Sequence, residues 1–374
     1  MISLDIEVEK ARIDEWSEIF DYREDLEKLQ RALNKSGSFE RVVVVGNGGS
    51  ITSYDAYFWA LSLQNNSKTV WTMDPSLLSW TAKEFPNDGK TVVVAVSKSG
   101  NTLGQIESLL YFKEYPVIVV TDPENGTLSQ IAKVLGWTMV VHPPVGGRFS
   151  GGTSSAFVPS CLAGIGVDKI QQGIVNGYEQ RDLAYSLANF YFEKEKEGFD
   201  EVYVNCYSEQ LAGFGNLIIQ LMHESVCKDG KGQTFYFAMG PESQHHTNQR
   251  FIGGKKNVIG TFIVAEKNES DQKQVVPENI KDIDYKSSKL SFLSNVTYQE
   301  ALHAEYQGTK EDADKNDVPN VTIALDRVSE ESVGRLVAFW HLVAFYSAIL
   351  RGVNPFDQPA VENSKNITLD ILKK

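Results

Sequence analysis

Two polar loops in the first third of the chain carry residue types that bind phosphate. Gly46-Asn47-Gly48-Gly49-Ser50 follows one run of β-branched residues, and Ser97-Lys98-Ser99-Gly100-Asn101-Thr102 follows another. Glycines let backbone N–H groups turn towards an anion, and hydroxyls with an ammonium group can surround its oxygens. Either loop alone could be a tight turn or a capped helix start. Two such loops on one sheet favour a site for a phosphorylated small molecule over a nucleotide site.

The glycine loop does not match the common nucleotide-binding fingerprints. Gly-x-Gly-x-x-Gly fails because Ile51 stands at the third glycine, and Asp74 lies further on than the usual ribose-binding acid. The Gly-Lys-Thr at 89–91 leads into a β-branched run rather than a helix, unlike a Walker loop. An NAD-dependent oxidoreductase is therefore disfavoured, and we expect no cofactor.

Short apolar runs alternate with amphipathic segments and indicate how the loops are positioned. The runs are 41–45, 91–96, 117–120 and 137–141, with helical patterns at 53–63, 104–112 and 128–135. Short runs without polar alternation, separated by helices, predict a parallel sheet buried on both faces. Ligands bind beyond the carboxyl ends of such strands, where both polar loops lie.

A second cycle of the same kind begins near residue 200. Strands are predicted at 202–205, 235–238, 258–264 and 321–325, with a helix from about 209 to 226. The polar region 266–317 is assigned to loops and peripheral helices. The fold class is therefore α/β, with two parallel sheets in tandem joined near residues 166–180.

Composition excludes several classes of protein. The 374 residues carry a net charge of -13, which disfavours nucleic acid and anionic membranes as partners. Three widely spaced cysteines argue for a reducing compartment, and the acidic N-terminus lacks a signal-peptide pattern. The apolar stretch 336–350 contains His341 and is too short to span a membrane, so we predict a buried helix. A cytoplasmic location is expected.

Two later segments extend the analysis to a known family. The pair of loops is similar to the sugar isomerase (SIS) domain. Pro144-Val145-Gly146-Gly147-Arg148-Phe149-Ser150 resembles the first signature of the glucose-6-phosphate isomerase (phosphoglucose isomerase) family. Residues 356–365, Phe-Asp-Gln-Pro-Ala-Val-Glu-Asn-Ser-Lys, resemble the second, in which glycine is commoner than Ala360. The resemblance covers residues 41–365.

The resemblance implies two SIS-type, flavodoxin-like αβα sandwich domains with parallel sheets, plus N- and C-terminal helices. The expected divisions are an N-terminal helical segment (1–35), a first SIS domain with the phosphate loops (36–175), a second SIS domain (176–352) and a C-terminal helix that completes the active site (353–374). The N-terminal segment is expected to be helical because Ile13, Trp16, Ile19 and Phe20 recur at helical spacing.

The family's chemistry is the interconversion of glucose 6-phosphate and fructose 6-phosphate by ring opening and proton transfer through a cis-enediol. It needs a carboxylate base, a cation near the enediolate and an acid–base pair for ring opening. Glu224 lies just outside the apolar stripe of its predicted helix, and Glu224-Ser225 followed by Lys228 resembles the base segment, although Val226-Cys227 departs from it. The alternative is a solvated helix glutamate.

The resemblance also assigns the other roles. Residues 244–249, Gln-His-His-Thr-Asn-Gln, match the family's Gln-His-x-x-x-Gln, which makes His245 the ring-opening residue, with Lys365 as its partner and His246 as an accessory residue. Arg148 is the candidate cation for the enediolate; its alternative is a structural salt bridge. The expected substrate-binding residues are Gly49, Ser50, Ser97, Lys98, Ser99, Thr102 and Gly147.

Alternatives to an isomerase of glucose 6-phosphate remain open from the sequence. A zinc site of His223, Glu224, His245 and His246 is disfavoured because Cys227 stands where His-Glu-x-x-His requires histidine. The chain could act on another phosphosugar, such as mannose 6-phosphate, or be a non-catalytic sugar-phosphate-binding SIS protein. The resemblance implies a homodimer in which the neighbouring subunit supplies the histidine.

Overall fold

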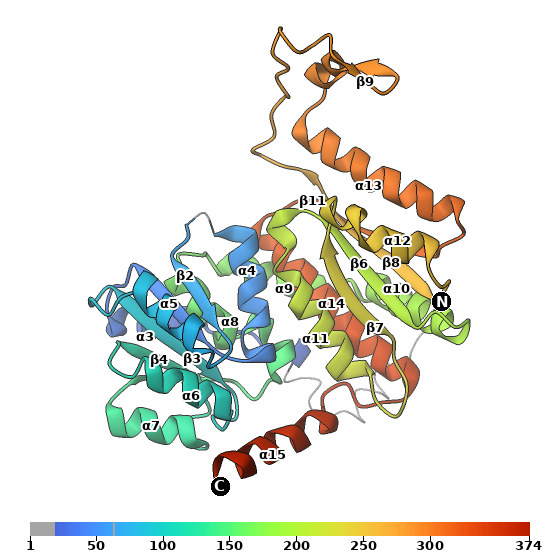
Figure 1. Ribbon diagram of the computed structural model, residues 1–374. Helices are drawn as coiled ribbons and strands as arrows, with labels where there is room; N and C mark the ends of the chain where they lie inside the picture. Colours follow the sequence, from blue (N-terminus) through green and yellow to red (C-terminus); the bar gives the residue numbers. More distant parts are fainter. Residues whose placement is uncertain (1–18, 63) are drawn as a thin grey trace.

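The computed structural model describes residues 19–62 and 64–374 and contains two parallel sheets flanked by helices (Figure 1). The first sheet has the order β2-β1-β3-β4-β5 and is parallel throughout. This is the flavodoxin-like order, in which the chain changes direction between β1 and β3. Its strands are β1 (Arg41–Val45), β2 (Ser67–Val70), β3 (Thr91–Ser97), β4 (Val117–Thr121) and β5 (Thr138–Val141).

Helices cover both faces of this sheet, as its nearly continuous β-branched strands require. All seven residues of β3 are buried, and Val45 of β1 pairs with Ala95 of β3. The covering helices are α3 (Leu26–Ser36), α4 (Thr52–Leu61), α5 (Pro75–Glu84), α6 (Leu103–Tyr111), α7 (Thr127–Leu135) and α8 (Ser154–Leu162). The α/β fold class predicted from the sequence is confirmed.

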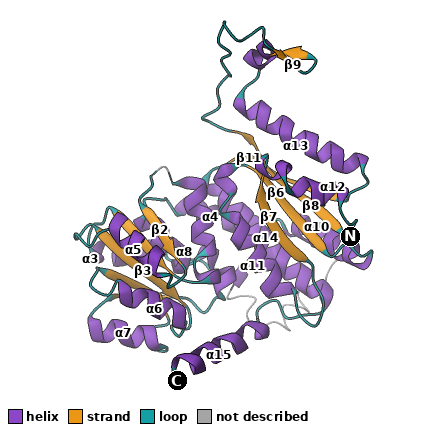
Figure 2. Cartoon of the chain, viewed as in Figure 1, coloured by secondary structure: helices purple, strands orange, loops and turns teal. Residues whose placement is uncertain are grey.

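The second sheet has the order β11-β8-β6-β7 and is also parallel. Its strands are β6 (Glu201–Tyr207), β7 (Thr234–Met239), β8 (Val258–Lys267) and β11 (Asn320–Arg327). Its helices are α9 (Asp168–Tyr178), α10 (Arg181–Lys196), α11 (Phe214–Val226), α12 (Thr247–Gly253) and α14 (Glu330–Arg351). Figure 2 shows the two sheets as separate groups of strands with helices between them.

The core of the molecule is organised around α14. Its Trp340 and His341 are fully buried, and it packs against α9, α10 and α11. Among the described residues, α14 is the one helix whose length and composition would allow it to cross a membrane, but 78% of its apolar window is buried inside the protein. The buried helix predicted at 336–350 is therefore confirmed.

Two segments extend from this body. Residues after β8 form an arm at the top of Figure 1 that contains the hairpin β9 (Asp284–Tyr285) and β10 (Ser288–Lys289) and leads into α13 (Tyr298–Lys315). At the other end, every residue of α15 (Glu362–Leu372) is exposed. The loops and peripheral helices expected at 266–317 are thus present, together with the unpredicted hairpin.

Some expectations differ in detail or lie outside the described part. Strand β2, Ser-Lys-Thr-Val, was not predicted because it is polar and lies at the sheet edge. Ile13 and Trp16 lie outside the described residues, whereas Ile19 and Phe20 are buried. The boundary expected at 175/176 falls within α9, and the four-part division of the chain stays a prediction.

Candidate functional site

The two phosphate-type loops lie side by side at the carboxyl end of the first sheet. They follow β1 and β3, which are adjacent and parallel, so both loops lie at the switch point of the sheet. Gln105 of α6 bridges the two strand ends: its amide nitrogen donates to the carbonyl oxygens of Val45, at 3.0 Å, and Val96. No sequence motif identifies Gln105, but its two hydrogen bonds hold the ends of β1 and β3 together at the site.

The second loop is folded by its own hydroxyls. The Ser97 hydroxyl accepts from the Gly100 N–H at 3.1 Å and lies 3.4 Å from the Thr102 hydroxyl. The Ser99 hydroxyl accepts from the Asn101 N–H at 3.3 Å. Thr102 precedes α6 without making a side-chain capping bond, which leaves its hydroxyl available to a ligand. Lys98 donates to the carbonyl oxygen of Pro144 at 2.7 Å and so points towards the first signature.

The glycine loop packs closely against that signature. The short helix η1 (Gly48–Ser50) contacts η2 (Gly147–Gly152). A Cβ atom on Gly49 would lie 2.2 Å from the backbone nitrogen of Arg148, closer than any side chain allows. Gly49 is therefore required for the approach of Arg148, and Gly147 faces it across the same contact.

Arg148 is the centre of the candidate active site. Its guanidinium is almost fully buried, and Nε donates to the Ser225 hydroxyl at 2.8 Å. Nη1 donates to Oε2 of Glu224 at 3.2 Å and to Oε1 of Gln358 at 2.7 Å. Nη2 donates to the carbonyl oxygens of Pro355 and Asp357 at 2.6 and 2.9 Å. These bonds fix the plane of the guanidinium and bring both signatures and the base segment together.

Glu224 lies in the last turn of α11, and its side chain is 27% exposed. Its Oε1 accepts from Gln220 at 3.0 Å, and Oε1 of Gln220 accepts from the Thr52 hydroxyl at 3.2 Å. One carboxylate oxygen of Glu224 thus faces Arg148. The other contacts Gln220, which in turn bonds to Thr52 on α4, a helix of the first sheet. Gln220 was missed by sequence reasoning, although its position four residues before Glu224 places it on the same helical face.

A hollow of about 340 Å³ opens beside this carboxylate. It is lined by Gly48 of the glycine loop and by Gln220 and Glu224 of α11. Asp55 and half-exposed Trp71 also line it. Burial raises the pKa of Asp55 to about 6, opposed by the hydrogen bond it accepts from Thr69. The hollow therefore places open space, a carboxylate and the glycine loop together.

Residues of the second signature stabilise the site through aromatic contacts and an ion pair. Phe356 packs edge-on against Phe149 and stacks on Phe345, with ring centroids 5.3 and 6.0 Å away. Asp357 forms an ion pair of 2.6 Å with Lys228. Burial lowers the pKa of Lys228, and Asp357 opposes that shift. Lys228 follows Glu224-Ser225 after Val226-Cys227. Although these two residues depart from the family's base segment, the chain keeps a lysine beside the site.

His245 and Lys365 do not reach Arg148 or Glu224 by any contact among the described residues. His223, next to Glu224, accepts from the Phe235 N–H at 2.9 Å, which places the end of α11 at the beginning of β7. His245 lies in η4 (Glu242–His245), beyond the other end of β7. Six strand residues span roughly 20 Å. Lys365 is exposed on α15 and pairs with Glu362 at 2.7 Å.

Two of the three histidines raised as possible metal ligands make other contacts. The Nε2 atom of His223 accepts a backbone N–H, and His246 pairs with Glu242 at 2.8 Å. No group of three His, Cys, Asp or Glu side chains in the described part of the chain is arranged to hold a metal ion. In this arrangement the cation beside Glu224 is Arg148.

Comparison with known proteins gives the family. No protein-family model matches the chain. It is 30% identical over 373 residues to glucose-6-phosphate isomerase from Methanocaldococcus jannaschii, an alignment that covers 94% of this chain and 88% of that protein. The chain belongs to the glucose-6-phosphate isomerase family. The resemblance carried by the two signatures is thus confirmed.

Solved structures agree with this family. A hypothetical protein from Thermus thermophilus superposes with a TM-score of 0.86 and 25% identity, over 93% of this chain and 88% of that one. A glucose-6-phosphate isomerase from Chlamydia trachomatis superposes with a TM-score of 0.77 over 93% of this chain and 72% of its own. At 19% identity, the latter likeness shows the shared fold.

Proposed function

We propose that this chain interconverts glucose 6-phosphate and fructose 6-phosphate. The observation that carries the proposal is the contact between Arg148 and Glu224, in which a cation meets a carboxylate that lines a hollow beside the glycine loop. A base and a positive charge so placed are what proton transfer through an enediolate requires.

The phosphate would be held at the switch point of the first sheet. Ser50, Ser97, Ser99 and Thr102 offer hydroxyls there, and Lys98 adds a positive charge. Gly49 and Gly147 let the two loops approach. The sugar carbons would then extend into the hollow towards α11. The phosphate charge has no role in bond breaking, so these residues would position the sugar.

Glu224 would move the proton between C1 and C2. It removes the proton from C2 of the open-chain aldose to give the enediolate; a proton then passes from O2 to O1, and Glu224 returns its proton to C1, which leaves the ketose. The negative charge that develops on the enediolate oxygens would face Arg148, whose five hydrogen bonds keep it from turning away. Preorganised charge of this kind is more effective than a mobile side chain. The reaction needs no metal or cofactor.

Ring opening would require a second chain. His245 lies beyond the far end of β7 from Glu224, so one subunit cannot present both to the same sugar. A homodimer in which each hollow receives His245 from the neighbouring subunit would solve this separation. Lys365 would join His245 if α15, which is exposed along its whole length, packs over the site in that dimer. We place this enzyme in the cytoplasm.

A coupled assay tests the proposal. Fructose 6-phosphate is supplied, and glucose 6-phosphate is detected by a dehydrogenase that accepts only this product. Mannose 6-phosphate is assayed in parallel to determine which epimer the site accepts. Turnover of fructose 6-phosphate to glucose 6-phosphate supports the proposal. Binding of sugar phosphate without turnover would contradict it in favour of a sugar-phosphate-binding protein.

A further inference from the structure

The hollow beside Glu224 extends beyond this carboxylate. Asn216, Gln220 and Glu224 line it at intervals of four residues on α11, so they share one face of the helix. Eight residues of helix rise about 12 Å, so the hollow follows about two turns of α11. Proton transfer uses only the end at Glu224, and the proposed reaction gives the other end no role.

Asp55 lies at this second end of the hollow. Gly213, just before α11, packs so closely on α4 that a Cβ atom there would lie 2.5 Å from the carbonyl oxygen of Asp55. The Asp55 side chain lines the hollow, and the residue is only 9% exposed. Asp55 is therefore beside the beginning of α11, whereas Glu224 is in its last turn.

One oxygen of the Asp55 carboxylate is left for a ligand. Oδ1 accepts from the Thr69 hydroxyl at 2.6 Å, but among the described residues Oδ2 has neither a hydrogen-bond donor nor a cation as its partner. Oδ2 is not sealed in the interior, and the open space that Asp55 lines is the hollow. Burying a carboxylate oxygen without a partner is unfavourable, so this oxygen is placed to accept from a hydroxyl of a bound molecule.

Trp71 provides an apolar wall for the same hollow. It follows β2, and its carbonyl oxygen accepts from the side chain of Asn47 in the glycine loop at 2.7 Å. Met73, two residues further on, packs against Gly104 of α6, where a Cβ atom would lie 2.8 Å from Cε of the methionine. The backbone around Trp71 is thus held on two sides, while its side chain is half-exposed. An exposed aromatic ring in such a place offers its face to the C–H groups of a sugar.

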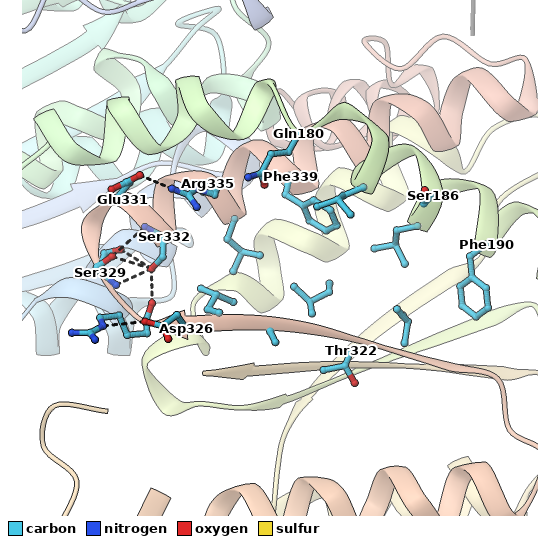
Figure 3. A pocket seen from close by; sticks show the side chains of 18 of the residues that line it. Gln180, Ser186, Phe190, Thr322, Asp326, Ser329, Glu331, Ser332, Arg335 and Phe339 are labelled. Carbon is cyan, nitrogen blue, oxygen red and sulfur yellow. Dashed lines mark hydrogen bonds and ion pairs between the residues drawn. The ribbon is translucent and has the colours of Figure 1, made fainter. Parts of the chain in front are cut away.

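A larger groove elsewhere in the molecule provides a contrast. It has a volume of about 790 Å³ and lies between α10, α14 and β11 (Figure 3). Its charged side chains have ion-pair partners, as Figure 3 shows for Glu331 with Arg335 and for Asp326 with Arg327. This groove therefore lacks the unpaired carboxylate oxygen that distinguishes the hollow, and it supplies a matched control residue in Asp326.

Given the function proposed above, we propose that Asp55 and Trp71 bind the unreactive hydroxyls of the sugar, those on C3 and C4, and so determine specificity. Oδ2 of Asp55 accepts from a sugar hydroxyl, and the Trp71 ring covers a C–H face of the carbon chain. A carboxylate repels the phosphate dianion, so Asp55 also favours the orientation in which the phosphate lies at Lys98.

Steady-state kinetics test the Asp55 contact. Asp55→Asn keeps an oxygen for Thr69 but removes the charge, so KM for fructose 6-phosphate should rise about tenfold. The change in kcat should be much smaller, because these hydroxyls are the same in the ground state and the transition state. Inhibition by inorganic phosphate, which has no sugar, should not weaken. Exposed Asp326→Asn should leave all three quantities unchanged, and an unchanged KM in Asp55→Asn would overturn the proposal.

Deoxy sugars identify the hydroxyl that Asp55 contacts. Binding of glucose 6-phosphate and of its 3-deoxy and 4-deoxy analogues is measured by calorimetry for the wild type and Asp55→Asn. One analogue should bind about tenfold more weakly to the wild type but lose almost no further affinity in Asp55→Asn, because a contact can be removed only once. Independent losses for both analogues would overturn the proposal. The measurement needs no turnover, so it stays decisive if the chain binds sugar phosphates without isomerising them.

Two further measurements separate ligand contact from a structural role. In urea unfolding at pH 7.5, Asp55→Asn should be at least as stable as the wild type, since it removes an unpaired buried charge. Trp71→Ala should raise KM roughly fivefold, and Trp71→Phe should restore it because a ring is kept. Fructose 6-phosphate should quench the tryptophan fluorescence of the wild type but not of Trp71→Phe. Joint loss of stability and affinity in Asp55→Asn, or quenching that is absent from the wild type or persists in Trp71→Phe, would overturn the proposal.

Discussion

The Nη1 atom of Arg148 lies 3.2 Å from the Oε2 atom of Glu224, across the boundary between the two sheets of the molecule. Arg148 follows the last strand of the first sheet, and Glu224 ends a helix of the second. The same guanidinium is held by Gln358 and by carbonyl oxygens of the C-terminal segment. A single buried side chain therefore joins three remote segments of the chain, so a change in any of them should affect catalysis.

Replacement of the base should abolish turnover while preserving binding. Glu224→Gln keeps the shape and the hydrogen bond from Gln220 but cannot accept the proton. We expect turnover of fructose 6-phosphate to fall by about 10² to 10⁴. A phosphorylated arabinonate, whose carboxylate mimics the enediolate, should still bind by calorimetry. Exposed Glu311→Gln is the control, and normal turnover of Glu224→Gln would require another base.

Shared active sites can be tested by mixing two inactive subunits. Glu224→Gln and His245→Ala chains are co-expressed with different tags, and the mixed dimer is purified. One of its two sites combines the intact Glu224 of one chain with the intact His245 of the other. Mixed dimers should recover about half of the wild-type activity, since one of two sites is intact. Activity no higher than that of either parent would contradict the shared site.

Loss of the phosphate hydroxyls should act mainly on substrate affinity. Ser97→Ala/Thr102→Ala removes groups that would contact ground state and transition state alike, so KM should rise about tenfold or more with a much smaller change in kcat. Steady-state kinetics measure both constants, with exposed Ser291→Ala as the control. A fall in kcat at unchanged KM would place the phosphate elsewhere.

Removal of metal ions should leave the activity intact. Arg148 already supplies the positive charge that an enediolate requires, so no cation has to be bound. Activity is measured after prolonged dialysis against EDTA and again after addition of zinc. Loss of activity with recovery on zinc would return the histidines near Glu224 to consideration as ligands.

Asp55 should make stability depend on pH. Its folded pKa is about 6, above the ordinary 3.8. Between these values the folded chain holds a proton that the unfolded chain has lost, so the free energy of unfolding falls as pH rises. The full loss in the free energy of unfolding that this shift causes is about 3 kcal/mol, reached above pH 7.

Asp55→Asn has no charge to bury, and its amide oxygen can still accept from Thr69. Urea unfolding at pH 4 and pH 7.5 measures the free energy of unfolding of both proteins. The stability of Asp55→Asn relative to the wild type should be greater at pH 7.5 than at pH 4. Exposed Asp370→Asn is the control. A constant difference between Asp55→Asn and the wild type at both pH values would contradict the shift.

The parallel strands and the phosphate-type loops could be predicted from local sequence. Runs such as 41–45 and 91–96 are buried on both faces, and that burial requires continuous β-branched residues. The loops are recognisable because glycine, serine and threonine serve anion binding through their own backbone and hydroxyl groups. Strand β2 was missed because an edge strand can be polar.

Tertiary structure decided which residues meet. Gln105 and Gln220 bridge elements of the site through partners that lie far away in the chain, which local sequence does not reveal. The motifs named Arg148, Glu224 and Gln358, and only the packing of the two sheets brought them within hydrogen-bond distance. The same packing separates His245 from Glu224 by the length of β7, because residue types specify chemistry locally whereas distance is set by how the elements pack.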